Sequence, residues 1–439
     1  MQGHKPDDWL DLLIMCRACS TPRHTLPTRR DGAAQQPPTQ QHYIPSPMTT
    51  SSATTTIALP VPPAASGRVA AHATRVAFFI GGFAMAAWAP LVPFTKERLG
   101  LNEAALGVLL LCMGAGSILS MPLAGAFSAR WGCRRVLVAS ALLACASLPL
   151  LTQVPTALWL GVALFFFGAG IGGLGCTANI QAILVERASR RPLMSGFHGL
   201  FSLGGVAGAG GVIGLLGQGA SLWQATCAVS AVALALLVRG APHFLSHGGA
   251  QSGPAFVRPT GGVLFIGTLC FILFLTEGAM LDWSALFLTQ VQGMPAQRAG
   301  LGYAAFAIAM TLGRLTGDRW VHRIGPERTV LAGALLAAAG LALATLVPAW
   351  PLALAGFALV GLGCSNIVPV LFSLAGRQHS MPESLAVPAI ATMGYAGVLM
   401  GPALIGFVAH GTSLVAAMLV LVALLVGVAA SARRLGTLD

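Results

Sequence analysis

The sequence predicts an all-α integral membrane protein with twelve transmembrane helices in two pseudo-symmetric six-helix bundles. Three observations support this fold class: the composition, the spacing of apolar runs and an internal repeat. Of the 439 residues, 55% are hydrophobic and only 9% are charged, and the mean hydropathy is +0.77. Because soluble domains carry about 25% charged residues, this composition excludes a soluble protein and a wholly disordered chain.

Residues 1–67 differ from everything that follows them. The stretch 21–63 is rich in Pro, Thr, Gln and Ser and has no apolar period, so we expect a disordered N-terminal extension. No signal peptide is predicted, because the apolar run 10–15 is too short and acidic residues flank it. Met48 is an alternative start of translation.

From residue 69 onward the chain consists of apolar runs, each long enough to cross a hydrocarbon core of ~30 Å, which needs ~20 helical residues. Strands of a membrane barrel are excluded, because they would be about 10 residues long with alternating hydrophobicity. We predict helices at 69–94, 104–128, 134–153, 155–183, 193–217, 221–239, 261–288, 297–317, 329–347, 351–374, 385–410 and 412–432.

The basic residues predict the orientation. One set of gaps between the runs holds fourteen arginines, and the alternate gaps hold only Lys96, Arg98 and Arg298. The positive-inside rule places the arginine-rich side in the cytoplasm. The N- and C-termini are then both cytoplasmic, which requires an even number of spans and agrees with twelve. The net charge of +12 therefore reflects topology, and no nucleic-acid partner is predicted.

The longest gap, 240–260, divides the helices into six and six. We predict an N-terminal bundle at 68–239, a central cytoplasmic loop at 240–260, a C-terminal bundle at 261–434 and a cytoplasmic tail at 435–439. The two bundles repeat each other in sequence. Segments that match are 132–144 with 325–337, and 173–179 with 361–366. A parallel six-helix repeat is a transporter architecture with its binding site at the midplane, between the halves.

Two loop motifs carry a repeated pattern of glycine, acid and arginine. The second copy contains Gly313, Asp318, Arg319, Gly325 and Arg328. The first copy contains Gly125, Arg130, Gly132, Arg134 and Arg135, with Ala129 at the acidic position. In these motifs the chain resembles the major facilitator superfamily, over residues 69–434. The resemblance implies that the acid braces a cytoplasmic gate, which we expect of Asp318 but not of the first half. Arg314 is assigned to the structure of the gate.

Further segments resemble the YbjJ-like branch of that superfamily, which lies near members similar to sugar permeases. These segments are 88–93, 195–202, 277–284 and 394–402.

Glu277 is the leading candidate for substrate binding or proton coupling. It lies well inside the apolar run 261–288, where an acidic residue costs roughly 2.5–3.5 kcal/mol on insertion scales and is usually functional. Asp282 is a second candidate, although it lies about 140° further around the helix. A helix-end or gate role is an equal alternative for Asp282, and a structural hydrogen bond is the alternative for Glu277.

Three further polar residues are candidates for the same site. His198 is able to shuttle protons or donate a hydrogen bond, or it is a packing histidine. Asn179 and Asn366 occupy matching positions of the repeat, where they either bind substrate or lock neighbouring helices together. The predicted site contains no catalytic and no metal-binding residues.

The sequence thus predicts a secondary active transporter of the cell (inner) membrane that moves a small solute by alternating access, coupled to protons. Its expected partners are a small-molecule substrate, protons and the lipid bilayer, and it is expected to be a monomer. Alternatives are a non-transporting sensor or scaffold on the same fold and, among transporters, drug-type efflux rather than sugar-like uptake.

No enzyme and no cofactor are predicted. The chain lacks GxxxxGK[ST], HExxH and GxSxG motifs, and its one CxxC pair, Cys16 and Cys19, has no second ligand pair.

Overall fold

The computed structural model describes residues 64–101, 103–249, 258–295, 298, 300–378 and 381–437. The predictions for residues 1–63, including the start at Met48 and the CxxC pair, lie outside the described residues. So do residues 250–257 of the predicted central loop and 438–439 of the tail. The first helix begins at Ala64, four residues before the predicted boundary of the N-terminal bundle.

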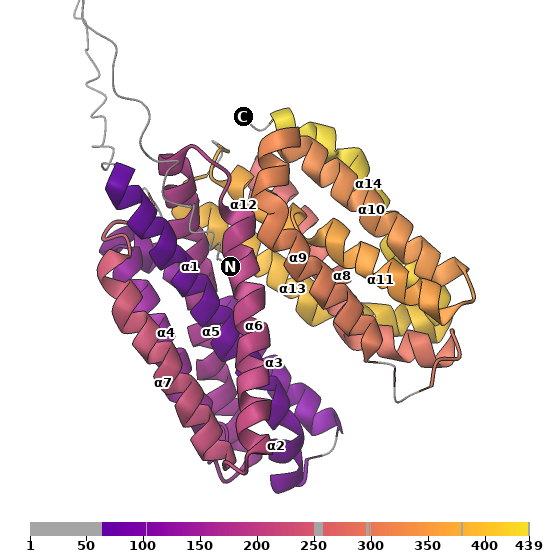
Figure 1. The fold of residues 1–439 in the computed structure, drawn as a ribbon, viewed down its shortest axis with the longest axis horizontal. Coiled ribbons are helices and arrows are strands. Elements are labelled where there is room, and N and C mark those ends of the chain that lie inside the picture. The colour runs from indigo at the N-terminus through magenta and orange to yellow at the C-terminus, as the bar shows by residue number, and fades with distance from the viewer. Residues whose placement is uncertain are drawn as a thin grey trace, which may run out of the picture. The chain divides into compact units, whose positions relative to one another are not determined.

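The described residues form helices and short connections (Figure 1). The first half contains α1 (Ala64–Ala87), η1 (Ala89–Leu91), α2 (Val92–Arg98), α3 (Glu103–Trp131), α4 (Cys133–Leu150), α5 (Ala157–Ser189), α6 (Met194–Gly217), α7 (Leu222–Gly240) and η2 (Ala241–His243). The second half contains α8 (Gly261–Gln290), α9 (Leu301–Ile324), α10 (Pro326–Leu346), α11 (Trp350–Cys364), α12 (Ile367–Ala375), α13 (Glu383–Gly411), α14 (Leu414–Ser431) and η4 (Ala432–Thr437).

Eleven helices in the described part of the chain are long and apolar enough to cross a membrane, with α11 and α12 counted as one span. The helix α9 is not among them, because Arg314, Asp318, Arg319 and Arg323 lower its hydropathy. It is nevertheless 24 residues long and contacts α6, α8 and α11. It stays a prediction that α9 is the twelfth span. The cytoplasmic location of both termini stays a prediction as well.

The repeated motifs lie mostly in helices, because α3 and α9 continue further than predicted, to Trp131 instead of 128 and to Ile324 instead of 317. The segments from Gly125 to Trp131 and from Gly313 to Ile324 continue α3 and α9, because backbone hydrogen bonds within a helix do not require apolar side chains. Only Gly132 and Gly325 form the turns, each with φ of +84°. A left-handed φ favours glycine, and its recurrence at matching positions supports the internal repeat.

Glycines allow the helices of each half to approach closely. A Cβ at Gly82 of α1 would overlap the backbone carbonyl of Phe201 in α6, and a Cβ at Gly168 of α5 would overlap that of Met113 in α3. In the second half a Cβ at Gly361 of α11 would overlap the carbonyl of Phe306 in α9. Small residues at such contacts are how membrane helices gain van der Waals packing without a hydrophobic driving force.

The two halves meet near the end that carries Arg130, Arg187 and Arg319, here called the arginine-rich end. Helix α6 contacts α9, α3 contacts α13, and α5 contacts α12, and Figure 1 shows α6 beside α9. The contact is close, because a Cβ at Gly125 of α3 would overlap Pro388 and the carbonyl of Ser384 in α13. These contacts hold both halves around one cavity.

Candidate functional site

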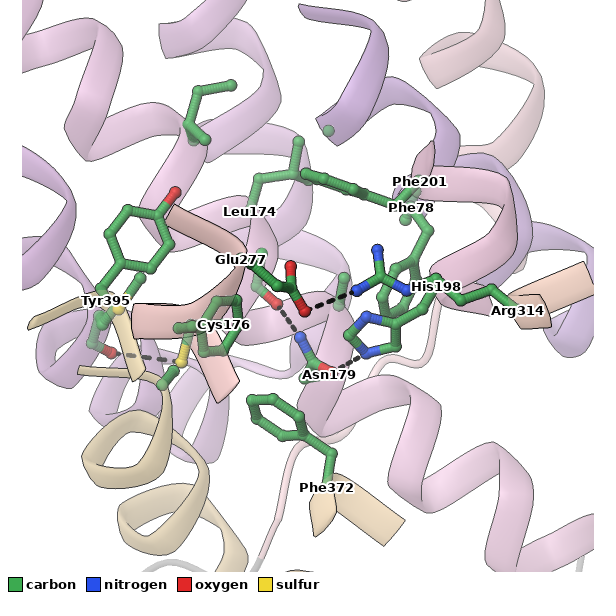
Figure 2. Close-up of a pocket in the computed structure, with 18 residues that line it drawn as sticks. Phe78, Leu174, Cys176, Asn179, His198, Phe201, Glu277, Arg314, Phe372 and Tyr395 are labelled. Atoms are coloured by element: carbon green, nitrogen blue, oxygen red, sulfur yellow. Dashed lines mark hydrogen bonds and ion pairs between the residues drawn. The ribbon is translucent and has the colours of Figure 1, made fainter. Parts of the chain in front are cut away.

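A cavity of about 130 Å³ lies between helices of both halves (Figure 2). At ~30 Å³ per water molecule this is room for about four of them, which suits a small solute. Helices α1, α3, α5 and α6 of the first half and α8, α9, α12 and α13 of the second contribute its walls. The lining residues are Ala77, Phe78, Gly81, Met121, Ile171, Leu174, Gly175, Cys176, Ala178, Asn179, His198, Phe201, Phe274, Glu277, Arg314, Phe372, Ala391 and Tyr395.

An ion pair forms the most polar part of the cavity. Nη2 of Arg314 lies 3.1 Å from Oε1 of Glu277, and Figure 2 shows the guanidinium turned toward that carboxylate. The side chains are only 8% and 18% exposed, respectively. A buried charge left without its partner costs several kcal/mol, so each residue requires the other in this conformation.

Arg314 is held by two further contacts. Its Nε donates to the carbonyl of Ser365 at 3.3 Å, and its Nη1 donates to Oγ of Ser202 at 3.1 Å. The carbonyl of Ser365 is available because Pro369, four residues later, has no N–H to donate in the helix. The chain accordingly breaks between α11 and α12 at this point. Ser202 belongs to α6, so Arg314 also joins the two halves.

A second polar pair lies on the first half. Nε2 of His198 lies 3.2 Å from Oδ1 of Asn179, whose amide donates to the carbonyl of Gly175 at 2.9 Å. The imidazole lies between Phe78 and Phe372, with ring centroids 5.1 Å and 5.9 Å away. The predicted candidates Asn179, His198 and Glu277 therefore line one cavity (Figure 2).

Asp282 and Asn366 do not line this cavity. Helix α8 runs unbroken through Gly278, so Asp282 projects away from Glu277 and is exposed. Asn366 donates to the carbonyl of Gly313 at 3.2 Å and to Oγ of Ser365 at 2.9 Å. The bond to Gly313 ties the break in the α11–α12 span to α9, which is the arrangement of an interhelical lock.

The motif residues lie at the arginine-rich end. Oδ2 of Asp318 accepts a hydrogen bond of 3.1 Å from the backbone N–H of Gly196, in the first turn of α6. A negative charge is favourable at a helix N-terminus. Glu186 of α5 accepts from the N–H groups of Leu193 and Met194 in the same turn. The motif arginines, all exposed, are Arg130, Arg134, Arg135, Arg319 and Arg328.

Sequence reasoning missed the role of Arg314 in the cavity and the aromatic residues around it. An arginine inside a long predicted helix was the available signal, because such a residue requires a buried partner. Phe201, Phe274 and Tyr395 gave no signal, since aromatic residues in membrane helices mostly serve packing. Across the described residues, no cluster of three His, Cys, Asp or Glu side chains is placed to hold a metal ion.

A cavity between two repeated halves, lined by a buried ion pair and aromatic rings, is the architecture of a membrane transporter. The family model of the Major Facilitator Superfamily matches residues 74–300. The chain belongs to this superfamily, and it is a multi-pass protein of the cell (inner) membrane and a secondary transporter.

Two relatives are similar over most of the chain. An MFS-type transporter of Yersinia pestis is 52% identical over 361 residues, which cover 82% of this chain and 94% of the relative. The membrane protein MosC of Rhizobium meliloti is 35% identical over 355 residues, which cover 79% and 85%. The YbjJ-like branch stays a prediction.

Two solved structures share the fold. FucP, the E. coli fucose:proton symporter, in its outward conformation has a TM-score of 0.69 at 16% identity, covering 84% of this chain and 99% of FucP. The proton:xylose symporter XylE has a TM-score of 0.64 at 12% identity, covering 84% and 96%. At these identities the likeness confirms the predicted fold class.

Proposed function

We propose that this secondary transporter moves a small neutral solute by alternating access, and that Glu277 couples the movement to protons. The observation that carries the proposal is the Glu277–Arg314 ion pair in a cavity lined by both halves. A carboxylate in such a place is able to accept a proton when hydrated from one side and to release it toward the other. FucP and XylE, which share the fold, are proton symporters.

The charges of the cavity favour a neutral solute. Glu277 and Arg314 cancel each other, and the other polar groups include the amide of Asn179, the imidazole of His198 and the phenol of Tyr395. Aromatic faces pack against apolar ring surfaces, while these groups offer donors and acceptors to hydroxyls. Such walls suit a sugar-like solute better than a multivalent ion. Drug-type efflux remains the alternative within transporters.

The contacts between halves at the arginine-rich end define the conformation. If that end is cytoplasmic, as the positive-inside rule predicts, the cavity is closed toward the cytoplasm by α6, α9, α3 and α13. Transport then requires these contacts to separate while the opposite ends approach. We propose that the protein does this as a monomer, since both walls of the cavity come from one chain.

The test is solute uptake by proteoliposomes under an imposed pH gradient, against a panel of sugars and drugs. We expect wild-type uptake above equilibrium, and Glu277→Gln should lose it while solute counterflow falls far less. Counterflow requires only that the loaded carrier reorient. Asp282→Asn is the matched control, because this carboxylate is exposed and outside the cavity. Wild-type uptake that ignores the pH gradient would refute proton coupling, and no flux of any solute would favour a sensor or scaffold.

A further inference from the structure

The contact between α6 and α9 is a seam of three successive pairs. Nearest the arginine-rich end, Oδ2 of Asp318 accepts from the N–H of Gly196 at 3.1 Å. One turn inward, a Cβ at Gly199 would lie 2.9 Å from Cδ2 of Leu315. Beside the cavity, Arg314 donates to Ser202 at 3.1 Å. The α6 residues are spaced by three, so they lie on one face of the helix.

The innermost pair connects this seam to the cavity. Arg314 bonds Glu277 through Nη2 and Ser202 through Nη1. Because the guanidinium is planar and its N–H groups are fixed relative to one another, a change at one nitrogen displaces the other. The Ser202 hydroxyl accepts from Arg314 and donates to the carbonyl of His198 at 3.3 Å. Polar contacts therefore run from Glu277 across the seam to His198.

We propose that Ser202 is a positioning residue that transmits the protonation state of Glu277, through Arg314, to the α6–α9 seam. The proposal rests on the proton coupling proposed above. While Glu277 is charged, it neutralises Arg314, whose second nitrogen bonds Ser202 and keeps the seam closed. A proton added to Glu277 leaves Arg314 as a buried charge without a counterion, which is unfavourable. The guanidinium then turns toward water or solute in the cavity, releases Ser202 and weakens the seam.

Other titratable groups surround the pair and require controls. They are His198 on α6, Cys176 on α5, Cys270 on α8, Tyr303 and Asp318 on α9, Cys364 on α11 and Tyr395 on α13. Among them His198 is the closest rival as a proton sensor, because the same chain of contacts ends at its backbone carbonyl.

The experiment measures opening of the seam in the full-length protein as a function of pH. Spin labels replace two exposed arginines near the arginine-rich end, Arg191 beside α6 and Arg323 on α9, and pulsed dipolar spectroscopy gives their distance distribution. In the wild type, acidification should raise the population with the longer distance. Ser202→Ala should show this population already at neutral pH and should flatten the pH response. Ser202→Thr retains the hydroxyl and should restore the response.

Transport provides the second measurement. Loss of a hydrogen bond to a charged group should lower uphill accumulation by Ser202→Ala roughly 10-fold, with a far smaller effect on counterflow. Arg314→Lys is a second variant, since an ammonium pairs with Glu277 but lacks the fixed fork that also reaches Ser202. It should show the same flattened pH response. Thermal melting and size exclusion check that each variant is folded.

The outcomes separate the two proposals. A wild-type pH response in Ser202→Ala would overturn the role of Ser202 and leave proton coupling intact. A pH response that persists in Glu277→Gln but vanishes in His198→Gln would also overturn the role of Ser202, because it would show that His198 is the group that senses protons. Wild-type uptake that ignores the pH gradient would instead refute the proposed function itself.

Discussion

Helices α3 and α9 occupy matching positions in the two halves, and each is followed by a glycine turn. The contacts that these two helices make with the opposite half nevertheless differ. In the second half the side chain of Asp318 in α9 reaches the first turn of α6. In the first half Ala129 precedes the motif arginine as Asp318 does, but it lies three residues before the glycine turn rather than seven. The repeat therefore duplicates the helices and the turns, but it does not duplicate the contact across the gate.

Backbone from the central segment 245–249 occupies the space near Ala129. The N–H groups of Cys133 and Arg134 donate to the carbonyls of His247 and Leu245 at 3.3 Å and 2.8 Å. A Cβ at Gly248 would overlap the carbonyl of Ser128. Gly249 continues this segment to α13, since its Cβ would lie 3.2 Å from the backbone nitrogen of Ser384. Backbone atoms of the segment 245–249 thus make the contact in the first half of the gate, whereas the carboxylate of Asp318 makes the contact in the second half.

An ion pair provides a further contact between the first half and α13. Arg187 of α5 pairs with Glu383 at the start of α13 and also donates to the carbonyl of Gly376. The side chains of Arg187 and Glu383 are 53% and 15% exposed, and pairs that reach the surface contribute about 0–1 kcal/mol. Asp318 is less exposed than Arg187 and bonds a helix N-terminus, where a charge contributes up to ~2 kcal/mol. From this comparison we predict that the contact of Asp318 with α6 stabilises the closed arginine-rich end more than the contacts of the first half do.

The largest effect is expected for Asp318→Asn. The amide keeps the shape of the side chain but removes the charge at the α6 N-terminus, so turnover should fall about 10-fold. Initial rates of solute exchange in proteoliposomes measure this change. Asp282→Asn is the control, because its carboxylate is exposed and away from both the cavity and the gate. Equal rates for Asp318→Asn and wild type would show that other contacts hold the gate.

A smaller effect is expected for Gly248→Val. Its side chain cannot fit against the Ser128 carbonyl, so the central segment must shift away from the α3–α4 turn. Because the rest of the gate remains, turnover should change about 5-fold. Gly300→Ala serves as the control, since a Cβ there meets nothing within 4 Å. Unchanged exchange by Gly248→Val would show that the segment only covers the gate.

A still smaller effect is expected for Glu383→Gln, which removes the ion pair with Arg187. Turnover should change about 2-fold at low salt, and the difference from wild type should vanish at high ionic strength because salt screens exposed charges. Exchange rates measured across a salt series test this. A loss as large as that of Asp318→Asn would reverse the proposed ranking of the two halves.

The sequence predicted the helices well because their length and apolar composition are dictated locally by the bilayer. It also predicted three cavity residues, since a polar group inside an apolar run must face other protein groups. It could not predict that Asn179 lines the cavity and that Asn366 does not. Both occupy matching positions, but the break after Ser365 turns Asn366 toward α9, while α5 continues unbroken past Asn179.

The partner of Glu277 was missed for a similar reason. Arg314 lies 37 residues away on another helix, and no local pattern connects the two positions. The role of segment 245–249 was also hidden, because its contacts are made by backbone atoms and leave no signature in residue type beyond Gly248 and Gly249. Contacts that depend on tertiary packing are the part that sequence periodicity does not encode.

The smallest single effect is expected for Ala129→Asp, which restores the acid that the first half lacks. The space that its side chain would enter already holds the central segment, with Gly248 against the backbone nitrogen of Ala129. The N-terminus of α13 already has contacts from Gly249 and from Arg187 through Glu383. Turnover should therefore stay within about 2-fold of wild type.

The double variant Ala129→Asp with Gly248→Val makes this comparison sharper. If the segment 245–249 and a carboxylate are alternative ways to fill the same place, Ala129→Asp alone should hardly change the exchange rate. In the double variant, however, the added acid should recover most of the rate that Gly248→Val loses. Such non-additivity is the signature of two groups that act at one site. Purely additive exchange rates would mean that the central segment supports the first half in another way. The acid of the second half would then have no functional counterpart in the first, and Asp318 would hold the gate alone.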